Sequence, residues 1–155
     1  MSRKFPAGVA TGSLLKDIIQ DAKENKYALP ACNVIGSSSV NAAMEAAAEV
    51  NSPVIIQFSN GGGASNAGKG LKGDNQLAAV KGSIAGALHI HTLAEAYGAT
   101  VILHTDHCAK NLLPWIDGVM DANEAYYKQN GNTLYSSHML DFSEEPLEEN
   151  VELSK

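Results

Sequence analysis

Cysteine is scarce in this sequence, and its scarcity narrows the class of protein. Cys32 and Cys108 are the only two. A small secreted domain would need a larger disulfide framework, so this pair favours a reducing setting. The sequence also lacks an apolar run of about 20 residues, the length of a membrane span, and residues 1–8 lack the apolar region of a signal peptide. We therefore expect a soluble, cytoplasmic protein with no membrane partner.

Positive charge is also in short supply. Lys and Arg number 11 against 17 Asp and Glu, which gives a net charge of −6, and the basic residues are scattered rather than clustered. Such a surface disfavours nucleic acid and anionic membranes as partners. Hydrophobic residues nevertheless make up 45% of the 155, enough for a sizeable core. The composition predicts one globular domain that spans residues 1–155.

The sequence that is present alternates between helical and strand-like segments. Helical spacing of apolar residues, with Ser13, the Ser37–Ser39 cluster, Gly98 and Ser143 as caps, predicts helices at 14–23, 40–50, 77–97, 112–129 and from Glu144. Strand-like runs, bounded by turn or polar residues, lie at 28–34, 53–58, 101–108 and 134–141. After the first helix, the chain therefore repeats a strand-then-helix unit four times.

The strand at 101–108 carries the polar residues on which the functional argument rests. It begins as a branched apolar run, typical of a buried parallel strand, and then reaches His104, Asp106 and His107. His104 and Asp106 point to one face of such a strand, and Thr105 points to the other. A carboxylate beside imidazoles can transfer protons or help to hold a divalent metal, although either residue alone is as easily a buried side chain satisfied by the backbone. The three together predict a functional site.

Four strand-then-helix units in one direction predict an α/β fold with a parallel sheet and right-handed crossovers. Polar residues gather near the carboxyl ends of the strands, namely Asn33, Gln57, Ser59, Asp106, His107 and Asp141. These ends form the catalytic face of a (β/α)8 TIM barrel, of which four units are half. A flavodoxin-like open sheet also fits the length of the chain.

Five short motifs make the sequence more specific. They are QFSNGG at 57–62, AGKG at 67–70, HTDHCAK at 104–110, LPWIDG at 113–118 and SSHM at 136–139. Together they resemble the N-terminal half of class II, zinc-dependent fructose-bisphosphate aldolases, and the run at 104–110 is the most specific of them. The resemblance extends from about Gly8 to the last residue, and it implies the first four βα units of a TIM barrel.

The resemblance also implies a reaction and a set of roles. The family cleaves fructose 1,6-bisphosphate reversibly into dihydroxyacetone phosphate and glyceraldehyde 3-phosphate, with zinc as a Lewis acid. Asp106 matches the catalytic acid–base, and His107 matches a zinc ligand. Ser59 matches a residue that contacts the aldehyde substrate, and Asn33 matches a polar residue nearby. Asp141 matches a carboxylate associated with a second metal position.

The zinc ligands are where the sequence departs from the family. A catalytic zinc usually takes three protein ligands, and only His107 is recognisable here; the other two histidines would fall beyond Lys155. His104 matches nothing beyond a supporting role. His89 and His91 lie two apart in a predicted helix and so on different faces. We expect weak zinc binding and little activity from the chain alone.

Two alternatives remain open at this point. Residues 63–70 come close to a P-loop, with two glycines and Lys69 correctly spaced after a strand, but Gly70 replaces the residue that holds magnesium. A nucleotide-binding protein is therefore weakly indicated, and a mobile substrate loop is the preferred interpretation. The other alternative is a non-catalytic half-barrel that acts only by association. Its two open sheet edges would favour a homodimer or pairing with the other half of a barrel.

Overall fold

The structure is a computed structural model that describes residues 4–68 and 70–155. The strands are β1 (Gly8–Val9), β2 (Ala31–Asn33), β3 (Val54–Phe58), β4 (Thr100–Cys108) and β5 (Ser137–Leu140). The helices are α1 (Gly12–Asn25), α2 (Ser37–Glu49), α3 (Asn60–Ala67), α4 (Leu77–Tyr97), the 3-10 turn η1 (Lys110–Leu112), α5 (Leu113–Asn130) and α6 (Leu147–Leu153). No helix in this part of the chain is long and apolar enough to cross a membrane.

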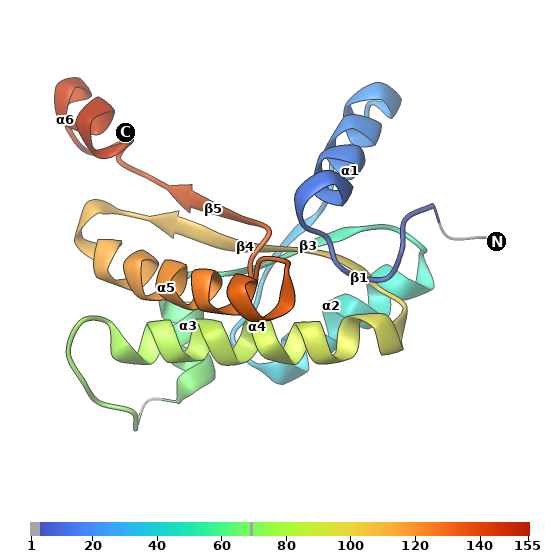
Figure 1. The fold of residues 1–155 in the computed structure, drawn as a ribbon, viewed down its shortest axis with the longest axis horizontal. Coiled ribbons are helices and arrows are strands. Elements are labelled where there is room, and N and C mark those ends of the chain that lie inside the picture. The colour runs from blue at the N-terminus through green and yellow to red at the C-terminus, as the bar shows by residue number, and fades with distance from the viewer. Residues whose placement is uncertain (1–3, 69) are drawn as a thin grey trace.

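The strands form one parallel sheet in which β2, β3, β4 and β5 are neighbours in chain order (Figure 1). β1 pairs with the first residues of β4, on the edge that β5 occupies further along. A flavodoxin-like sheet would reverse its strand order and carry crossover helices on both faces. Here the order is sequential and α2, α4 and α5 cover one face, which is the arrangement of a TIM barrel.

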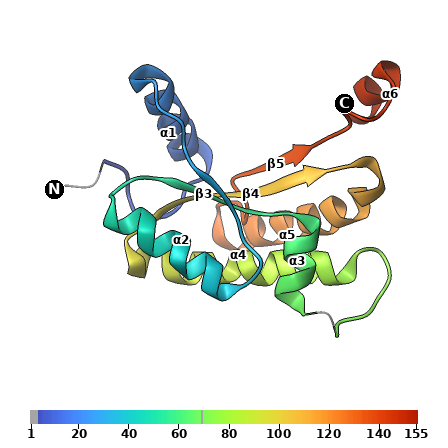
Figure 2. The ribbon, with the colours of Figure 1, turned by 180° about the vertical axis from the view of Figure 1, so that it is seen from behind.

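The two faces of the sheet have different partners, as strand periodicity requires. Ile56 of β3 and Leu103 of β4 are fully buried against α2, α4 and α5 in the main core. Their neighbours Ile55 and Ile102 point to the other face, where Ile18 of α1 packs on them. Figures 1 and 2 show α1 on the opposite side of the sheet from the other long helices. We call the face of the sheet away from α2, α4 and α5 the concave face. It is covered by α1 near the amino ends of the strands.

α4 is the element that the sequence predicted best. Its observed bounds are the predicted ones, and Gly98 follows it in the left-handed region with φ of 74°. Gly supplies this conformation without the steric penalty of a Cβ atom. His89 and His91 lie in α4 as expected, and both rings form hydrogen bonds with neighbouring segments. His89 Nε2 bonds Asn41 at 2.7 Å, and His91 Nε2 bonds the Leu134 carbonyl at 2.8 Å.

Several helix starts differ from the prediction. Thr11, not Ser13, is the N-cap of α1, and α2 begins at Ser37 rather than Val40. The last helix begins at Leu147 rather than Glu144. The residue before a proline avoids the helical region, so Pro146 blocks a helix through Glu145 and becomes the N-cap of α6.

The sequence missed α3 altogether, because its glycines were interpreted as a loop. Ser59 caps this helix by accepting a hydrogen bond from the Gly62 amide at 3.1 Å. The glycines allow α3 to lie against α4. A Cβ on Gly63 would lie 2.6 Å from the Ala79 carbonyl oxygen, and one on Gly82 would lie 1.8 Å from the Gly63 carbonyl oxygen. Close helix packing, rather than mobility, explains glycine at these positions.

The helix corrects the interpretation of residues 63–70. Residues 63–67 are helical, so they cannot form the loop that cradles phosphate in a P-loop protein. Lys69 lies outside the described residues. The structure therefore does not favour the nucleotide-binding alternative, and the mobile substrate loop cannot begin as early as Gly63.

Candidate active site

Polar side chains from three neighbouring strands meet at the carboxyl edge of the concave face. The register sets Asn33 of β2 beside Gln57 of β3, and Gln57 beside His104 of β4. Asn33 Nδ2 donates to Asp106 Oδ2 at 2.7 Å, and Gln57 Nε2 donates to Asn33 Oδ1. Because Gln57 supplies the donor for Oδ1, the Asn33 amide is oriented with its own NH2 toward the carboxylate. The hydrogen bonds thus hold one oxygen of Asp106 in place.

His107 links this group to the next strand. Its Nδ1 lies 2.8 Å from Oδ2 of Asp141, which follows β5, and its Nε2 lies 3.7 Å from Oδ1 of Asp106. The His107 side chain is 63% exposed, whereas that of Asp106 is 14% exposed. The sequence-predicted residues Asn33, Asp106, His107 and Asp141 therefore lie in one continuous chain of contacts. Asp106 is its sheltered member, and His107 faces solvent.

The carboxylates around His107 set its electrostatics. The hydrogen bond to Asp141 and then the charge of Asp106 raise the pKa of His107. Hydrogen bonds from Ser143 and then His107 lower the pKa of Asp141 to about 2. An ionised carboxylate only accepts hydrogen bonds, so Asp141 holds the proton of His107 on Nδ1. The Nε2 atom is then left to accept a proton or to bind a metal.

Ser59 lies at the end of β3 but acts here within its own helix. Its hydroxyl oxygen caps α3, and its side chain is half-buried. If the Ser59 hydroxyl contacts substrate, the same hydroxyl also fixes the start of α3. No contact joins Ser59 to Asp106 or His107 among the described hydrogen bonds.

His104 and His138 lie beside the site and occupy opposite faces of the sheet. His104 Nδ1 bonds the Ser137 hydroxyl at 2.8 Å, and burial lowers its pKa. His138 Nδ1 bonds Thr105 at 2.9 Å on the helix side. Burial lowers the pKa of His138 to about 4, and its Nε2 is buried without a hydrogen-bond partner within the described chain. Both imidazoles are therefore neutral near pH 7.

Cys108, at the end of β4, is a packing residue rather than a nucleophile. It is fully buried in the main core. Burial, helped by the charge of Asp117, raises the pKa of its thiol to about 11. The reactive thiolate form is therefore negligible at neutral pH.

The donor chemistry at this edge partly fits a zinc ion. Imidazole and carboxylate are zinc ligands, and a histidine that donates its other N–H to a carboxylate is the usual arrangement at zinc sites. The pair His107–Asp141 has that form. In residues 4–68 and 70–155, however, no three His, Cys, Asp or Glu side chains gather closely enough to hold a metal. The described residues thus offer a suitable imidazole, that of His107, but not a complete coordination shell.

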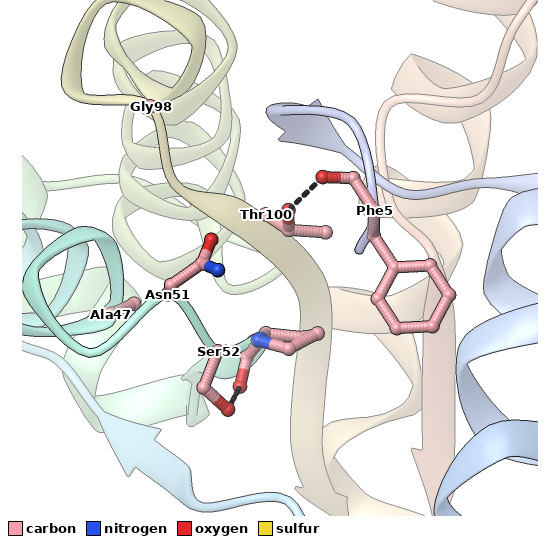
Figure 3. Close-up of a pocket in the computed structure, with 7 residues that line it drawn as sticks. Phe5, Ala47, Asn51, Ser52, Gly98 and Thr100 are labelled. Atoms are coloured by element: carbon pink, nitrogen blue, oxygen red, sulfur yellow. Dashed lines mark hydrogen bonds between the residues drawn. The ribbon is translucent and has the colours of Figure 1, made fainter. Parts of the chain in front are cut away.

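The cavity beside the site is larger than one at the amino ends of the strands. A hollow of about 590 Å³ opens beside Asp141 and Ser143, next to the site. At the opposite edge of the sheet, Phe5, Asn51 and Thr100 line a void of only about 10 Å³ (Figure 3). Thr100 donates from its hydroxyl to the Phe5 and Pro6 carbonyls there, at 3.4 and 2.8 Å. Room for about one water molecule excludes a substrate at that edge.

Sequence reasoning noticed Gln57 only as a polar residue near a strand end. Its role becomes visible in the register, because Gln57 lies between Asn33 and His104 on the same face. The alternation along β3 contained a usable signal: Ile56 and Phe58 are buried on the helix side, so Gln57 had to face the site.

A sequential parallel sheet with carboxylate and imidazole side chains at its carboxyl edge is the architecture of the TIM-barrel class. The family model described as "Fructose-bisphosphate aldolase class-II" matches residues 13–155. The chain therefore belongs to the class II fructose-bisphosphate aldolase family.

Individual relatives agree with this assignment. The chain is 59% identical over 146 residues to a fructose-bisphosphate aldolase of Edwardsiella ictaluri, and 57% identical over 147 residues to the class 2 enzyme of Escherichia coli. A crystal structure of the Campylobacter jejuni aldolase superposes with a TM-score of 0.90 at 56% identity. That match covers 96% of this chain and 42% of the other.

The chain corresponds to only part of each relative. The chain spans about 41% of the length of the Edwardsiella and Escherichia relatives. Its fold corresponds to half of a barrel, as the sequence predicted. Family membership favours neither the nucleotide-binding nor the purely associative alternative.

Proposed function

We propose that this chain supplies the catalytic acid–base and one zinc ligand of the class II aldolase reaction. The reaction is the reversible cleavage of fructose 1,6-bisphosphate to dihydroxyacetone phosphate and glyceraldehyde 3-phosphate. Family membership supports the reaction type. The observation that carries the proposal is the unbroken chain of contacts from Asn33 through Asp106 and His107 to Asp141.

Asp106 is the proposed acid–base because its two oxygens are in different situations. Oδ2 accepts a hydrogen bond from Asn33, whereas Oδ1 faces the exposed imidazole of His107. Oδ1 is therefore the oxygen free to take the proton of a substrate hydroxyl during cleavage and to return it during condensation. Asn33 keeps the carboxylate from rotating between these states.

His107 is the proposed zinc ligand through Nε2, with Asp141 holding the opposite ring nitrogen. A zinc ion bound there would supply a Lewis acid that polarises the ketone carbonyl of the substrate. Asp141 accepts from His107 through Oδ2 and from the Ser143 amide through Oδ1, and the lone pairs that these bonds leave free are the ones that would serve the second metal position.

The remaining assignments follow from the same proposal. The substrate is a small phosphorylated sugar, Ser59 contacts its aldehyde portion while capping α3, and the setting is the cytoplasm. Two free thiols, Cys32 and Cys108, are compatible with that compartment. Residues 1–155 act as one unit, the N-terminal half of the barrel domain. The chain alone turns over little substrate, because among the described residues no three His, Cys, Asp or Glu side chains gather closely enough to hold zinc.

A chimera tests the catalytic assignment. This chain replaces the matching segment of the Escherichia coli relative, and cleavage of fructose 1,6-bisphosphate is measured with zinc. We expect Asp106→Asn to lower kcat by at least about 100-fold with a much smaller change in KM, because proton transfer belongs to the transition state.

The matched control is Asp121→Asn, which removes an exposed carboxylate on α5, outside the site. It should leave kcat unchanged. Wild-type turnover in the Asp106→Asn chimera would refute the role of Asp106. An inactive wild-type chimera that is folded and zinc-loaded would refute the proposed function as a whole.

A further inference from the structure

We propose that Thr105 and His138, which meet on the helix side of the sheet, are positioning residues of the site on its concave face. They fix a β-bulge in β4, and this bulge brings Asp106 and His107 to the same face. The inference rests on the proposed function, since it explains how the proposed acid–base and the proposed zinc ligand come to lie together. The two strands concerned, β4 and β5, are paired with each other inside the chain (Figure 1).

The pairing of β4 with β5 contains one extra residue on β4. Thr105 and Cys108 are three positions apart on β4, whereas the residues paired with them on β5 are only two positions apart. Two residues of β4, Asp106 and His107, therefore stand against a single residue of β5. Such a two-against-one step is a β-bulge, a feature that re-aims side chains and is common beside active sites.

Side-chain direction shows what the bulge does. Thr105 is paired in register with Phe58, a residue of the main core, and so lies on the helix side of the sheet. Cys108 is buried in the same core. In an unbroken strand, residues three positions apart point to opposite faces, whereas these two share one. The alternation therefore skips one position between them, and Asp106 and His107 are the residues that lie there.

The contacts of the site agree with this interpretation. Asp106 bonds Asn33 on the concave face, and His107 Nε2 lies 3.7 Å from the other oxygen of Asp106. In an unbroken strand His107 would follow Thr105 to the helix side, where Thr105 is fully buried. The bulge therefore explains how two side chains that are adjacent in the sequence share one face of the sheet.

The bulge lies between two fixed points. Before it, Thr105 Oγ1 lies 2.9 Å from Nδ1 of His138. After it, the Asp141 amide donates to the Cys108 carbonyl at 2.9 Å. An extra residue can move along a pair of strands unless the pairs on both sides of it are fixed. Because the second contact joins backbone atoms, Thr105 and His138 are the side chains that set the position of the bulge.

His138 is itself held by the helix layer. Its ring packs on that of Tyr135, with the ring centroids 5.4 Å apart. The buried Tyr135 hydroxyl donates to the Ser83 carbonyl of α4 at 2.8 Å, and the Tyr135 amide donates to Asn123 of α5 at 2.9 Å. These contacts connect Thr105 to α4 and α5. The helix layer therefore fixes the strand at the point where the bulge begins.

Thr105→Val tests the contact, because valine has the shape of threonine without its hydroxyl. Thr100→Val is the matched control, since Thr100 is also a buried threonine of β4 whose hydroxyl donates a hydrogen bond, but it lies at the amino end of the strand. Both variants lose a buried hydrogen bond and should unfold at lower urea concentration than the wild type. Only Thr105→Val should disturb the site, and Thr105→Ser, which keeps the hydroxyl, should behave as the wild type.

The first measurement locates the ring proton of His107. Long-range 1H–15N spectra of the metal-free chain, at a pH at which the ring is neutral, distinguish Nδ1 from Nε2, and His107→Ala assigns the signals. In the wild type and in Thr100→Val we expect the proton on Nδ1, because Asp141 accepts it there. In Thr105→Val the proton should move to Nε2, since the ring no longer faces Asp141. A wild-type spectrum in Thr105→Val would overturn the proposal.

The second measurement uses the chimera with the Escherichia coli relative. Thr105→Val should lower kcat by about tenfold with little change in KM, because a displaced acid–base slows the chemical step. Thr100→Val and Thr105→Ser should keep the wild-type kcat. Equal losses of kcat in Thr105→Val and Thr100→Val would overturn the proposal, because they would reveal only a general loss of structure.

The His138 side of the contact supplies a second pair of variants if valine prevents folding. His138→Asn carries its amide near the position of Nδ1, so the His107 proton should stay on Nδ1. His138→Gln carries its amide near the position of Nε2, so the His107 proton should move as it does in Thr105→Val. The same proton position in both variants would contradict a role for the bond to Thr105.

The two measurements distinguish this proposal from the proposed function. The spectra require neither zinc nor turnover. An inactive wild-type chimera together with a displaced His107 proton in Thr105→Val would refute the proposed function and support the fixing of the bulge. An active wild-type chimera whose kcat is unchanged by Thr105→Val would refute the role of Thr105 and His138 alone.

Discussion

At the scale of single residues, Asp106 and His107 show how adjacent side chains acquire different tasks. The strand sends Asp106 to the concave face, where Asn33 fixes one of its oxygens. His107 comes one residue later and turns toward Asp141 at the rim. Asp106 is sheltered and His107 is exposed, which suits them to the proton-transfer and metal-binding roles proposed for them.

We predict that zinc binding by the chain depends on His107. His107→Ala should reduce zinc affinity by at least tenfold, because it removes the exposed imidazole that lies between Asp106 and Asp141. Asp141→Asn should produce a loss of about 10-fold to 100-fold, since it removes the partner that orients the ring. Isothermal titration with zinc at constant pH measures both.

His89→Ala is the control for the zinc titration, because His89 bonds Asn41 on the helix side of the sheet. It should bind zinc as the wild type does. If His107→Ala also bound zinc with wild-type affinity, His107 would have no part in the site.

At the scale of elements, the sequence predicted the long amphipathic and branched segments well and the boundary regions less well. α4 and β3 follow directly from their apolar spacing and capping residues. α3 could not be predicted in the same way, because its glycines are there for contact with α4, which is distant along the chain. Likewise, the bond between Asn33 and Asp106 spans 73 positions, and only the strand register brings the two together.

The close contact between α3 and α4 predicts an unusual response to alanine. In an exposed helix, Gly→Ala stabilises by up to about 1 kcal/mol. At Gly82 the added Cβ would meet the Gly63 carbonyl oxygen at 1.8 Å and the Ala67 amide nitrogen at 2.8 Å. Backbone atoms cannot move aside cheaply, so we expect Gly82→Ala to lower the free energy of unfolding by about 1–3 kcal/mol.

Gly61→Ala is the matched control for urea unfolding. Gly61 lies in the first turn of α3, and a Cβ atom added there would meet nothing within 4 Å, so the variant should be neutral or slightly stabilised. A Gly82→Ala protein as stable as the wild type would show that α3 does not lie against α4 at this distance.

At the scale of the whole molecule, buried histidines couple stability to pH. Burial lowers the pKa of His138 from 6.5 to about 4, so the unfolded chain binds a proton that the folded chain does not between these values. The stabilisation is complete above about pH 6.5 and decreases as the pH falls toward 4. Its upper limit is about 3 kcal/mol, and His91, whose pKa burial also lowers, adds to the decrease.

Denaturant unfolding between pH 7 and 4 at fixed protein concentration measures this dependence. His138→Gln should flatten the curve over that range, because the amide does not titrate. Asp141, with its pKa near 2, should lose its contribution only below about pH 4, which separates the two effects. An identical slope in the wild type and His138→Gln would show that His138 is not a buried neutral group.

The position of α1 gives the concave face the form of a cup rather than a tunnel. Ile18 rests on Ile55 and Ile102 and forms the floor, while His104 with Gln57, and then Asp106 with Asn33, form two successive tiers of wall above it. The floor blocks approach from the amino ends of the strands. A ligand that reaches Asp106 would therefore not come from beneath, and the carboxyl edge, where the exposed His107 lies, is the nearest opening.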